Sequence, residues 1–407
     1  MTEPFLFNPI DPSVRRDPYA LYERGRREHP AFAHAGLPIP LVSVFRYADV
    51  QAVLRDAELF SNDFSRGRAL SPELQTLVDQ APPSMLGLDP PDHTRLRSLV
   101  NKAFTPRIVR QLEPRLREVA HALLDDALEQ RDVDLVQALT YPLPVTAIAE
   151  IIGVPAADQE QFKVWSDQAV ATLGTGFFTP PTLEQIQKQM ALRDEMNRYF
   201  IPLAEARRRE PQEDLLTGLV QAEHEGSKLS QDEMLAMLVL LLVAGNETTT
   251  TLIGNAVLTL LDHPGELKRL RDDPGLMPGA VDEVLRFDSP VQFDPRRATR
   301  ATRIAGTPIA ADTLVLNWLG SANRDERVFE RPDVFDISRE KNPHLAFGFG
   351  THHCLGHNLA RLEASVALEV LLARTSSFER TDGDLLPLHP SPVFKAVTKL
   401  PVRLEPR

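Results

Sequence analysis

The 407-residue chain has a single cysteine, Cys354, so an intramolecular disulfide is excluded and nothing indicates an oxidising compartment. Aromatic residues are also few, at 6% of the chain. A ligand pocket in this protein is therefore expected to be lined by aliphatic side chains and a few phenylalanines. A lone cysteine is most often a small buried apolar residue, so any other role must be argued from its surroundings.

Long basic runs are also missing, and the formal net charge is −12 with acidic residues spread along the chain. This balance argues against nucleic acid as a partner and indicates a soluble protein. The polar start from Met1 to Asp17 lacks the pattern of a signal peptide. The longest uncharged apolar run, Met234–Gly245, has twelve residues, fewer than the roughly twenty that span a bilayer. We expect a cytoplasmic protein with no membrane partner.

The chain shows no internal repeat and no flexible linker rich in glycine and serine, which favours a single domain over residues 1–407. Apolar spacing predicts helices over Tyr19–Glu28, Pro114–Gln130, Leu183–Arg209, Ser230–Asp262 and Leu359–Ala373. Short strands are expected over Leu41–Phe45, Arg296–Ile304, Thr313–Leu316 and Val397–Leu404, with early and late strands pairing in a small sheet. The predicted fold class is mainly α with small β-sheet regions.

The surroundings of Cys354 are unusual, because three glycines fall within the segment Phe347–Gly356. Glycines permit tight turns and let the backbone approach a flat ligand closely. A helical pattern starts soon afterwards, at Leu359. The cysteine is thus expected close to a helix N-terminus, where the helix dipole and free N–H groups favour a thiolate. A thiolate is the form in which cysteine binds a metal.

Three other interpretations of this loop compete. Gly348 and Gly350 could open a dinucleotide-binding loop, although the third glycine of that motif is absent. A zinc site could use Cys354 with the histidines at 352, 353 and 357, but the usual paired-cysteine spacing is missing. A nucleophilic cysteine paired with a histidine, as in some hydrolases, is also conceivable.

The long helix predicted after Ser230 has one charged residue in its centre. Ser230 and Glu233 form a capping box, and from Met234 to Leu261 the only charge is Glu247. Four consecutive threonines follow it, against helix propensity, as often happens at functional sites. We expect the hydroxyl of the first of them, Thr248, to bond back to the carbonyl of residue 244. The structural alternative is a buried carboxylate paired with an Arg or Lys.

Positively charged side chains occur at two further places that could meet an anionic ligand. His93 and Arg97 are spaced i, i+4 and share one face of a predicted helix, which could equally be a solvated charged face. Arg296 and Arg297 are neighbours on a predicted strand, so their side chains point to opposite faces and only one can reach a given ligand. Glu283 and Arg286 form an i, i+3 pair of a kind that recurs elsewhere in the chain.

The cysteine loop resembles the haem-binding signature of the cytochrome P-450 monooxygenases. The match comprises Phe347, Gly350, His352, Cys354 and Gly356, with a histidine at 352 where many members have arginine. The resemblance implies that Cys354 is the axial ligand of the haem iron. It further implies that Phe347 packs beside the thiolate and that His352 helps to anchor the haem.

Other segments match the same family in the same order. Ala-Gly-Asn-Glu-Thr-Thr at 244–249 is similar to the oxygen-activation segment, which implies that Glu247 and Thr248 relay protons. The resemblance also implies that His93, Arg97 and Arg296 contact the haem propionates. Arg296 is preferred over Arg297 because it stands ten residues before Gly306. The pair of Glu283 and Arg286, joined by Arg339, would be structural.

The resemblance covers nearly the whole chain and implies the cytochrome P-450 haem-thiolate fold with haem b as cofactor. The implied activity is dioxygen activation, with hydroxylation or epoxidation of an apolar small molecule. Electrons would come from a separate ferredoxin and ferredoxin reductase, so NAD(P)H acts only indirectly, and the protein would be a monomer. Two alternatives remain: a haem-thiolate peroxygenase that uses hydrogen peroxide, and a non-catalytic haem-binding sensor.

The resemblance also implies a substrate pocket, made of Leu240, Ala244, Val291, Phe293 and Phe394. In Phe162–Pro181, glycines, a Phe pair and a Pro pair interrupt two helices, so this segment is expected to be either a surface turn packed by its own side chains or a lid over a ligand cavity. A basic docking patch for the electron donor is expected from Lys102, Arg107, Arg110 and His353.

Overall fold

The computed structural model describes residues 4–37, 39–63, 84–101, 104–170, 181–224, 227–383 and 385–407, together with Leu74, Thr76 and Phe178. Most of the expected lid segment and Lys102 of the expected docking patch lie outside these residues.

Helices dominate the described part of the chain and cover most of its length. The α-helices are α1 (Pro12–Arg16), α2 (Tyr19–Glu28), α3 (Tyr47–Arg55), α5 (Asp92–Asn101), α6 (Pro106–Gln111), α7 (Glu113–Gln130), α8 (Pro142–Ile152), α9 (Gln159–Val170), α10 (Leu183–Arg209), α11 (Leu215–Gln221), α12 (Gln231–Asp262), α13 (Pro264–Asp272), α14 (Met277–Phe287), α15 (Leu319–Ala322) and α16 (His357–Arg374). Shorter helical turns are η1 (Met85–Gly87), η2 (Val136–Thr140), η3 (Ala156–Asp158), η5 (Pro274–Leu276) and η6 (Gly350–His352).

The strands are short and fall into two small sheets and two hairpins. They are β1 (Ala31–Ala33), β2 (Leu41–Val44), β3 (Phe60–Ser61), β4 (Asp132–Asp134), β5 (Glu223–His224), β6 (Ser227–Lys228), β7 (Phe293–Ala298), β8 (Thr302–Ile304), β9 (Thr307–Ile309), β10 (Leu314–Trp318), β11 (Thr375–Arg380) and β12 (Pro401–Pro406). The five-stranded sheet has the order β1-β2-β10-β7-β3, and the three-stranded sheet has the order β11-β12-β4.

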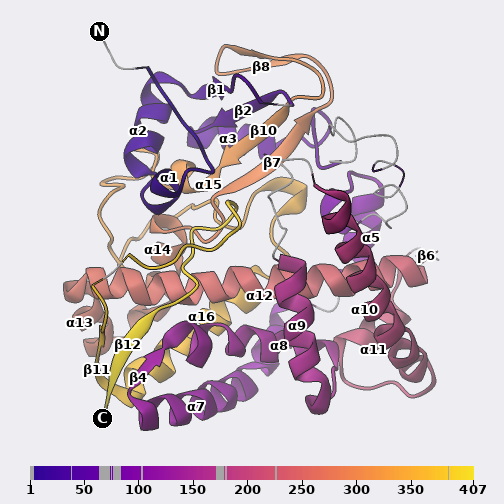
Figure 1. Cartoon of the computed structure of the whole chain (residues 1–407), viewed down its shortest axis with the longest axis vertical. Coiled ribbons are helices and arrows are strands. Elements are labelled where there is room, and N and C mark those ends of the chain that lie inside the picture. Colours follow the sequence, from indigo (N-terminus) through magenta and orange to yellow (C-terminus); the bar gives the residue numbers. More distant parts are fainter. Residues whose placement is uncertain are drawn as a thin grey trace.

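Helix α12 is the axis of the molecule and crosses its full width (Figure 1). Its start is fixed by the expected capping box: Ser230 N donates to Glu233 at 2.8 Å, and Glu233 N donates to the Ser230 hydroxyl at 3.2 Å. By length and composition alone this helix could cross a membrane. Its apolar side chains are instead buried against other helices, including α8, α9, α14 and α16. The apolar run is therefore a feature of the protein core.

The larger sheet and the helices α7, α8 and α16 lie on different sides of α12 (Figure 1). The five-stranded sheet and helices α1, α2 and α3 lie on one side, and α7, α8 and α16 lie on the other (Figure 1). Strands from both ends of the chain meet in the larger sheet, since β2 pairs in parallel with β10 and β10 pairs antiparallel with β7. This pairing confirms that early and late strands share a small sheet.

Most predicted elements are confirmed, and two strand predictions are wrong in part. The strand expected over Arg296–Ile304 is divided, because β7 ends at Ala298 and β8 pairs instead with β9. Positive φ values at Ala305 and Gly306 close the β8–β9 hairpin. The strand expected from Val397 begins only at Pro401, and it pairs with β11 and β4 outside the larger sheet.

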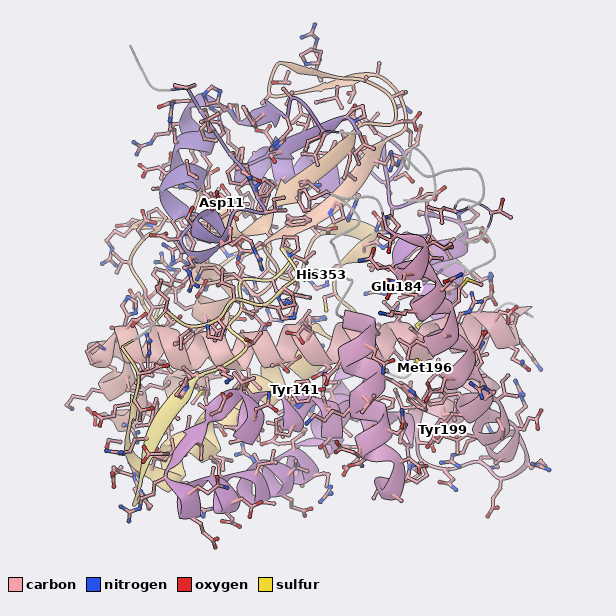
Figure 2. The ribbon with its side chains drawn as sticks, viewed as in Figure 1. Asp11, Tyr141, Glu184, Met196, Tyr199 and His353 are labelled. Atoms are coloured by element: carbon pink, nitrogen blue, oxygen red, sulfur yellow. The ribbon has the colours of Figure 1, made fainter. Side chains whose placement is uncertain are left out.

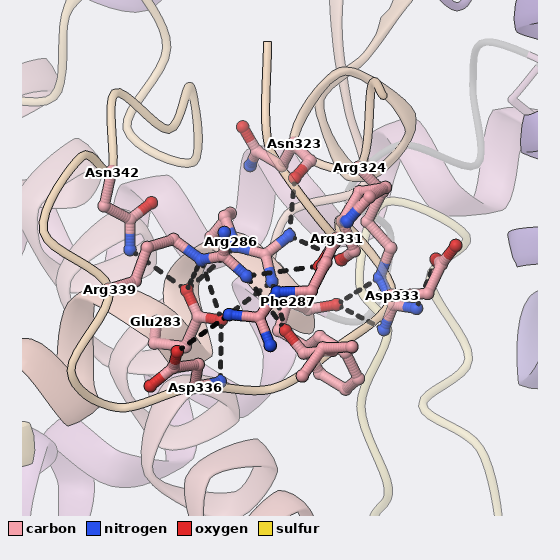
Figure 3. Close-up of polar contacts among 12 residues, drawn as sticks. Glu283, Arg286, Phe287, Asn323, Arg324, Arg331, Asp333, Asp336, Arg339 and Asn342 are labelled. Carbon is pink, nitrogen blue, oxygen red and sulfur yellow. Dashed lines mark hydrogen bonds and ion pairs between the residues drawn. The ribbon is translucent and has the colours of Figure 1, made fainter. Parts of the chain in front are cut away.

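A buried ion-pair cluster connects α14 to the segment that leads into the cysteine loop (Figure 3). Glu283 accepts from the Arg286 guanidinium at 2.8 Å, and both side chains are fully buried. Arg339 donates to the same carboxylate at 3.0 Å, and Asn342 adds a bond at 3.2 Å. Arg286 also donates to backbone carbonyls, among them that of Asn323 at 3.0 Å. The structural role expected for this pair and for Arg339 thus matches its geometry.

Replacing Glu283 by Gln tests how much the fold depends on this cluster. Removing one member of a buried ion pair leaves the other charge without compensation, which typically costs about 3–5 kcal/mol. We expect a loss of that size in the free energy of unfolding, measured by urea denaturation. Glu184→Gln is the matched control, because its pair with Lys188 is largely exposed. Equal stability of the two variants would contradict a structural role for the cluster.

Candidate functional site

The cysteine loop is a tight turn that requires glycine. The Cys354 N–H donates to the Phe347 carbonyl at 2.9 Å, which closes the loop. Gly348 and Gly350 have φ values of +70° and +75°, a region that glycine adopts easily. A Cβ at Gly350 would also lie 2.5 Å from the Leu54 carbonyl oxygen. The loop backbone therefore packs directly against α3 with no room for a side chain.

Cys354 lies just before α16, which begins at His357. The pKa of its thiol is nevertheless raised, because burial outweighs the Gly356 N–H and the positive charges of Arg97 and Arg361. The N–H group at the helix start does lower the pKa, as expected, but burial has the larger effect in the protein by itself. A bound metal cation supplies the missing charge, since a coordinating thiol loses its proton.

The three histidines of the loop do not converge on one point. His353 and His357 pack edge to face, with ring centroids 4.9 Å apart, and His357 Nδ1 lies 3.0 Å from the Cys354 carbonyl. His352 faces the other way, toward His93. In the described part of the chain no group of three histidine, cysteine or acidic side chains is arranged to hold a metal ion. The zinc arrangement considered above is therefore not formed there.

Cationic and imidazole side chains from three distant segments converge beside this loop. The ring of His93 on α5 lies 4.0 Å from that of His352, and both histidines interact electrostatically with Arg296 of β7. Both ring nitrogens of His93, Nε2 of His352 and one Nη of Arg296 are buried and have no hydrogen-bond partner among the described residues. Burial, together with the neighbouring positive groups, lowers the pKa of His352 to about 3. This donor set fits a buried ligand that carries carboxylates.

The two arginines on β7 are both buried, at 2% and 5% exposure. Arg296 bonds Asp294 and, at 2.7 Å, the Pro295 carbonyl, and one of its Nη atoms has no hydrogen-bond partner among the described residues. Arg297 donates to the Asp312 carbonyl at 2.7 Å. Arg97 is already tied to the cysteine loop, because it donates to the His353 carbonyl at 2.7 Å. Because both β7 arginines are buried and both bond backbone carbonyls, these contacts do not choose between them, and the role of Arg296 stays a prediction.

One face of α12 is uncovered in the middle of the molecule. Ala244 is exposed there, and its helical neighbours Leu240, Val243, Glu247 and Thr248 are partly exposed. Most residues between and beyond them are buried, namely Leu241, Leu242, Asn246, Thr249 and Thr250. The five open positions follow i, i+3, i+4, i+7, i+8 spacing and share one face. Figure 2 shows His353 of the cysteine loop on the sheet side of this helix. An uncovered apolar face inside a molecule is typical of a ligand cavity.

The expected hydrogen bond in this helix is present. The Thr248 hydroxyl donates to the Ala244 carbonyl at 2.6 Å, while the helix continues unbroken from Gln231 to Asp262. Asn246 points away from the open face and donates to the Ser166 hydroxyl of α9 at 2.8 Å. The Asn246 amide therefore serves the packing of α12 on α9.

Glu247 is held in a low-polarity environment. Burial, with a smaller contribution from Asp167, raises the pKa of its carboxyl to about 7. Its neighbour is His389 of the segment between β11 and β12, whose Nε2 lies 3.3 Å from Glu247 Oε1. Sequence analysis considered an arginine or lysine as partner and missed this histidine, because no local pattern connects the two segments.

A second buried carboxylate was also missed. Glu363 of α16 is 2% exposed and hydrogen bonds Thr249 of α12. Burial raises the pKa of its carboxyl to about 8. The sequence signal that could have revealed it is a charged residue within the apolar pattern of the last long helix.

The expected pocket residues divide into two groups. Leu240 and Ala244 lie on the open face of α12, and Val291 is partly exposed. Phe293 and Phe394 are instead covered, at 1% and 3% exposure, within a cluster that includes Trp318. The two rings therefore back the cavity rather than line it in this structure. Phe178, at the tip of the expected lid, packs edge to face on Phe293 with centroids 5.9 Å apart.

The expected docking patch is described only in part. Arg107 and Arg110 are exposed on α6, and His353 is half-buried beneath Arg97.

Comparison with known proteins identifies the family. The cytochrome P450 family model matches residues 4–274 and 275–399. The chain is 42% identical to the putative cytochrome P450 YjiB of Bacillus subtilis (strain 168) over 361 residues, 88% of this chain and 87% of the relative. It is 43% identical to the erythromycin C-12 hydroxylase of Saccharopolyspora erythraea over 336 residues, 81% of each chain. The structure of cytochrome P450 CYP109Q5 from Chondromyces apiculatus superposes with a TM-score of 0.88 at 41% identity and 98% coverage of both chains.

The chain therefore belongs to the cytochrome P450 family, and the predicted fold class is confirmed. It is a haem-thiolate monooxygenase that takes haem b as cofactor and receives electrons from redox partners.

The glycine at 350 gives a direct test of the loop geometry. Gly350→Ala forces both a strained φ and a clash with the Leu54 carbonyl, so we expect a loss above about 2 kcal/mol in unfolding free energy and a lower haem content. Gly306→Ala is the control, because its φ of +86° is similar but nothing lies within 4 Å of its Cβ. In Gly306→Ala we expect only the backbone strain, a loss of about 1 kcal/mol in the free energy of unfolding. Equal losses would show that the contact with α3 is unimportant.

Proposed function

We propose that this protein hydroxylates or epoxidises an apolar small molecule at a haem held by Cys354. One observation carries the proposal: buried, unpartnered nitrogens of His93, His352 and Arg296 converge beside the cysteine loop. They suit the two propionates of a haem, which Cys354 would hold through its thiolate. Haem, when bound, supplies the iron at which dioxygen is activated.

The chain's own residues supply the remaining functions. His93, Arg97, Arg296 and His352 would balance the propionate charge, and Phe347 would shield the thiolate from water, since its ring lies against the histidines of the loop. The Arg361 guanidinium lies over that ring at 4.5 Å. A thiolate shielded from water keeps its electron density for the metal.

The open face of α12 provides the polar groups for proton transfer. Glu247 has a pKa of about 7, so near neutral pH its carboxyl can both give and accept a proton. Thr248 is the next residue, and its hydroxyl oxygen remains available as an acceptor while it donates to Ala244. We assign the proton relay to this pair. The apolar residues Leu240, Val243, Ala244 and Val291 around it favour an apolar substrate.

The remaining parts of the proposal concern partners and location. We assign the electron supply to a ferredoxin and its NAD(P)H-dependent reductase, docking near the exposed Arg107 and Arg110. An acidic protein of this size, with its long apolar helix in the core, is consistent with a cytoplasmic monomer built as one domain over residues 1–407. The relative named erythromycin C-12 hydroxylase supports hydroxylation as the type of reaction.

Cys354→Ser tests the proposal. Loss of the thiolate should abolish the thiolate-characteristic absorption band of the reduced carbon monoxide complex and reduce substrate turnover at least a hundredfold. Thr351→Ala, an exposed position of the same loop, is the control and should keep the band. A Cys354→Ser variant with an intact band would refute the proposal.

Thr248→Ala tests the proton relay. Without the hydroxyl, electrons should be diverted to hydrogen peroxide, so product formed per NAD(P)H consumed should fall severalfold. The measurement compares NAD(P)H consumption, product and peroxide in one reaction. Thr259→Ala, a buried threonine farther along the same helix, should leave this ratio unchanged. Undiminished coupling in Thr248→Ala would remove Thr248 from the mechanism.

A further inference from the structure

The contact between Glu247 and His389 connects the centre of α12 with the last part of the chain. His389 Nε2 lies 3.3 Å from Glu247 Oε1, and both side chains are largely buried, at 9% and 12% exposure. The His389 ring also packs edge to face on Phe394 at 5.2 Å. A buried imidazole in contact with a buried carboxylate has few alternative positions.

The protonation of His389 follows from its other ring nitrogen. The Ser391 backbone N–H donates to His389 Nδ1 at 3.1 Å, so Nδ1 must be the acceptor. Burial, with a smaller contribution from the positive Arg15, lowers the pKa of His389 to about 4, so the ring is neutral near pH 7. A neutral ring with an accepting Nδ1 carries its hydrogen on Nε2. Nε2 is the ring nitrogen that lies 3.3 Å from Glu247 Oε1.

The segment that carries His389 is fixed by a residue that is distant in the sequence. Arg15 of α1 donates to the carbonyls of His389 and, at 2.7 Å, Ser391. The His389 N–H donates to the Ala396 carbonyl at 2.9 Å. Arg15 thereby fixes the backbone on both sides of Pro390. The imidazole is thus presented to α12 by a braced loop.

The other groups near Glu247 cannot play the same role. Asp167 of α9 is a like charge that raises the pKa of Glu247, and it accepts a bond from the Tyr141 hydroxyl. Tyr141 therefore directs its proton to Asp167, and Asn246 directs its amide to Ser166. Of the polar side chains that the structure describes around this carboxyl, His389 is the one whose ring nitrogen lies within ion-pair distance of it, at 3.3 Å.

We propose that His389 is a positioning residue for Glu247: its Nε2–H donates to the carboxylate, holds it beside the C-terminal segment, and releases it when the carboxyl turns toward Thr248. The proposal rests on the relay role assigned to Glu247 above. In this arrangement His389 itself neither gains nor loses a proton. It sets the resting position and the proton affinity of Glu247, which is the residue that gains and loses the proton.

Two substitutions of His389 distinguish the role of its Nε2 from that of its Nδ1. In His389→Gln the side-chain amide can reach the place of Nε2 and still donate to Glu247. In His389→Asn the amide can reach only the place of Nδ1, so the bond to the Ser391 N–H is retained and the contact with Glu247 is lost. Both variants are polar and smaller than histidine, and the retained loop bond favours folding of the Asn variant.

The primary measurement is infrared titration of the Glu247 carboxyl in the haem-loaded protein, with Glu247→Gln used to identify the band. A donor to a carboxylate favours its charged form, so loss of the donor raises the pKa. In His389→Asn we expect a three- to tenfold higher proton affinity, and in His389→Gln a titration close to that of the unmodified protein. Asp167 and Tyr141 are unchanged in both variants, so they cannot produce the difference. Identical titrations of the Asn variant and the unmodified protein would overturn the proposal.

Two further results keep this test independent of the assigned mechanism. Arg15→Ala loosens the loop without changing the ring, so it should shift the same titration in the same direction by a smaller amount. An unshifted Arg15→Ala would overturn the braced-loop argument even if His389→Asn failed to fold. Coupling of NAD(P)H to product in Glu247→Gln tests the relay alone. A shifted titration with unaffected coupling in Glu247→Gln would retain His389 as the residue that positions Glu247 and reject the relay.

Discussion

The burial of arginine and histidine side chains beside the cysteine loop is the constraint on which the rest of the structure depends. His93, Arg97, Arg296 and His352 come from α5, β7 and the loop, and each pays a desolvation cost on burial. Neutral imidazoles reduce that cost, which is why His352 has a strongly depressed pKa in the protein alone. A haem with two propionate charges offsets this desolvation cost, because each positively charged side chain then gains a counter-charge. Cofactor and protein thus complete one another electrostatically.

The mostly helical body gives these groups their geometry. The cysteine loop is fixed at one end by the Glu283 cluster and closed onto α3 by Gly350, so the sulfur has little freedom. The opposite wall is α12, whose uncovered face carries both apolar side chains and the pair Glu247 and Thr248. The assigned chemistry requires a thiolate held in a fixed position and proton-transferring side chains that can move. The cysteine loop provides the first, and Glu247 with Thr248 provides the second.

Local signals in the sequence account for what could be predicted. Apolar spacing predicted the extent of α10, the capping box at Ser230 and Glu233 predicted the start of α12, and the loop motif located Cys354. Strand alternation predicted that only one of Arg296 and Arg297 reaches a given ligand, and the position ten residues before Gly306, implied by the resemblance, selected Arg296. What escaped prediction depends on tertiary contacts. His389 approaches Glu247 only because Arg15 and Ser391 fix its loop, and the covered state of Phe293 depends on Trp318 from a different strand.

The contact between Arg15 and the segment around His389 has a consequence for biosynthesis. The two partners are 374 to 376 positions apart in the chain, so Arg15 leaves the ribosome long before its partners are synthesised. The segment around His389 cannot take its place beside Glu247 until it too has left the exit tunnel. During synthesis, the face of α12 that carries Glu247 therefore lacks this part of its cover.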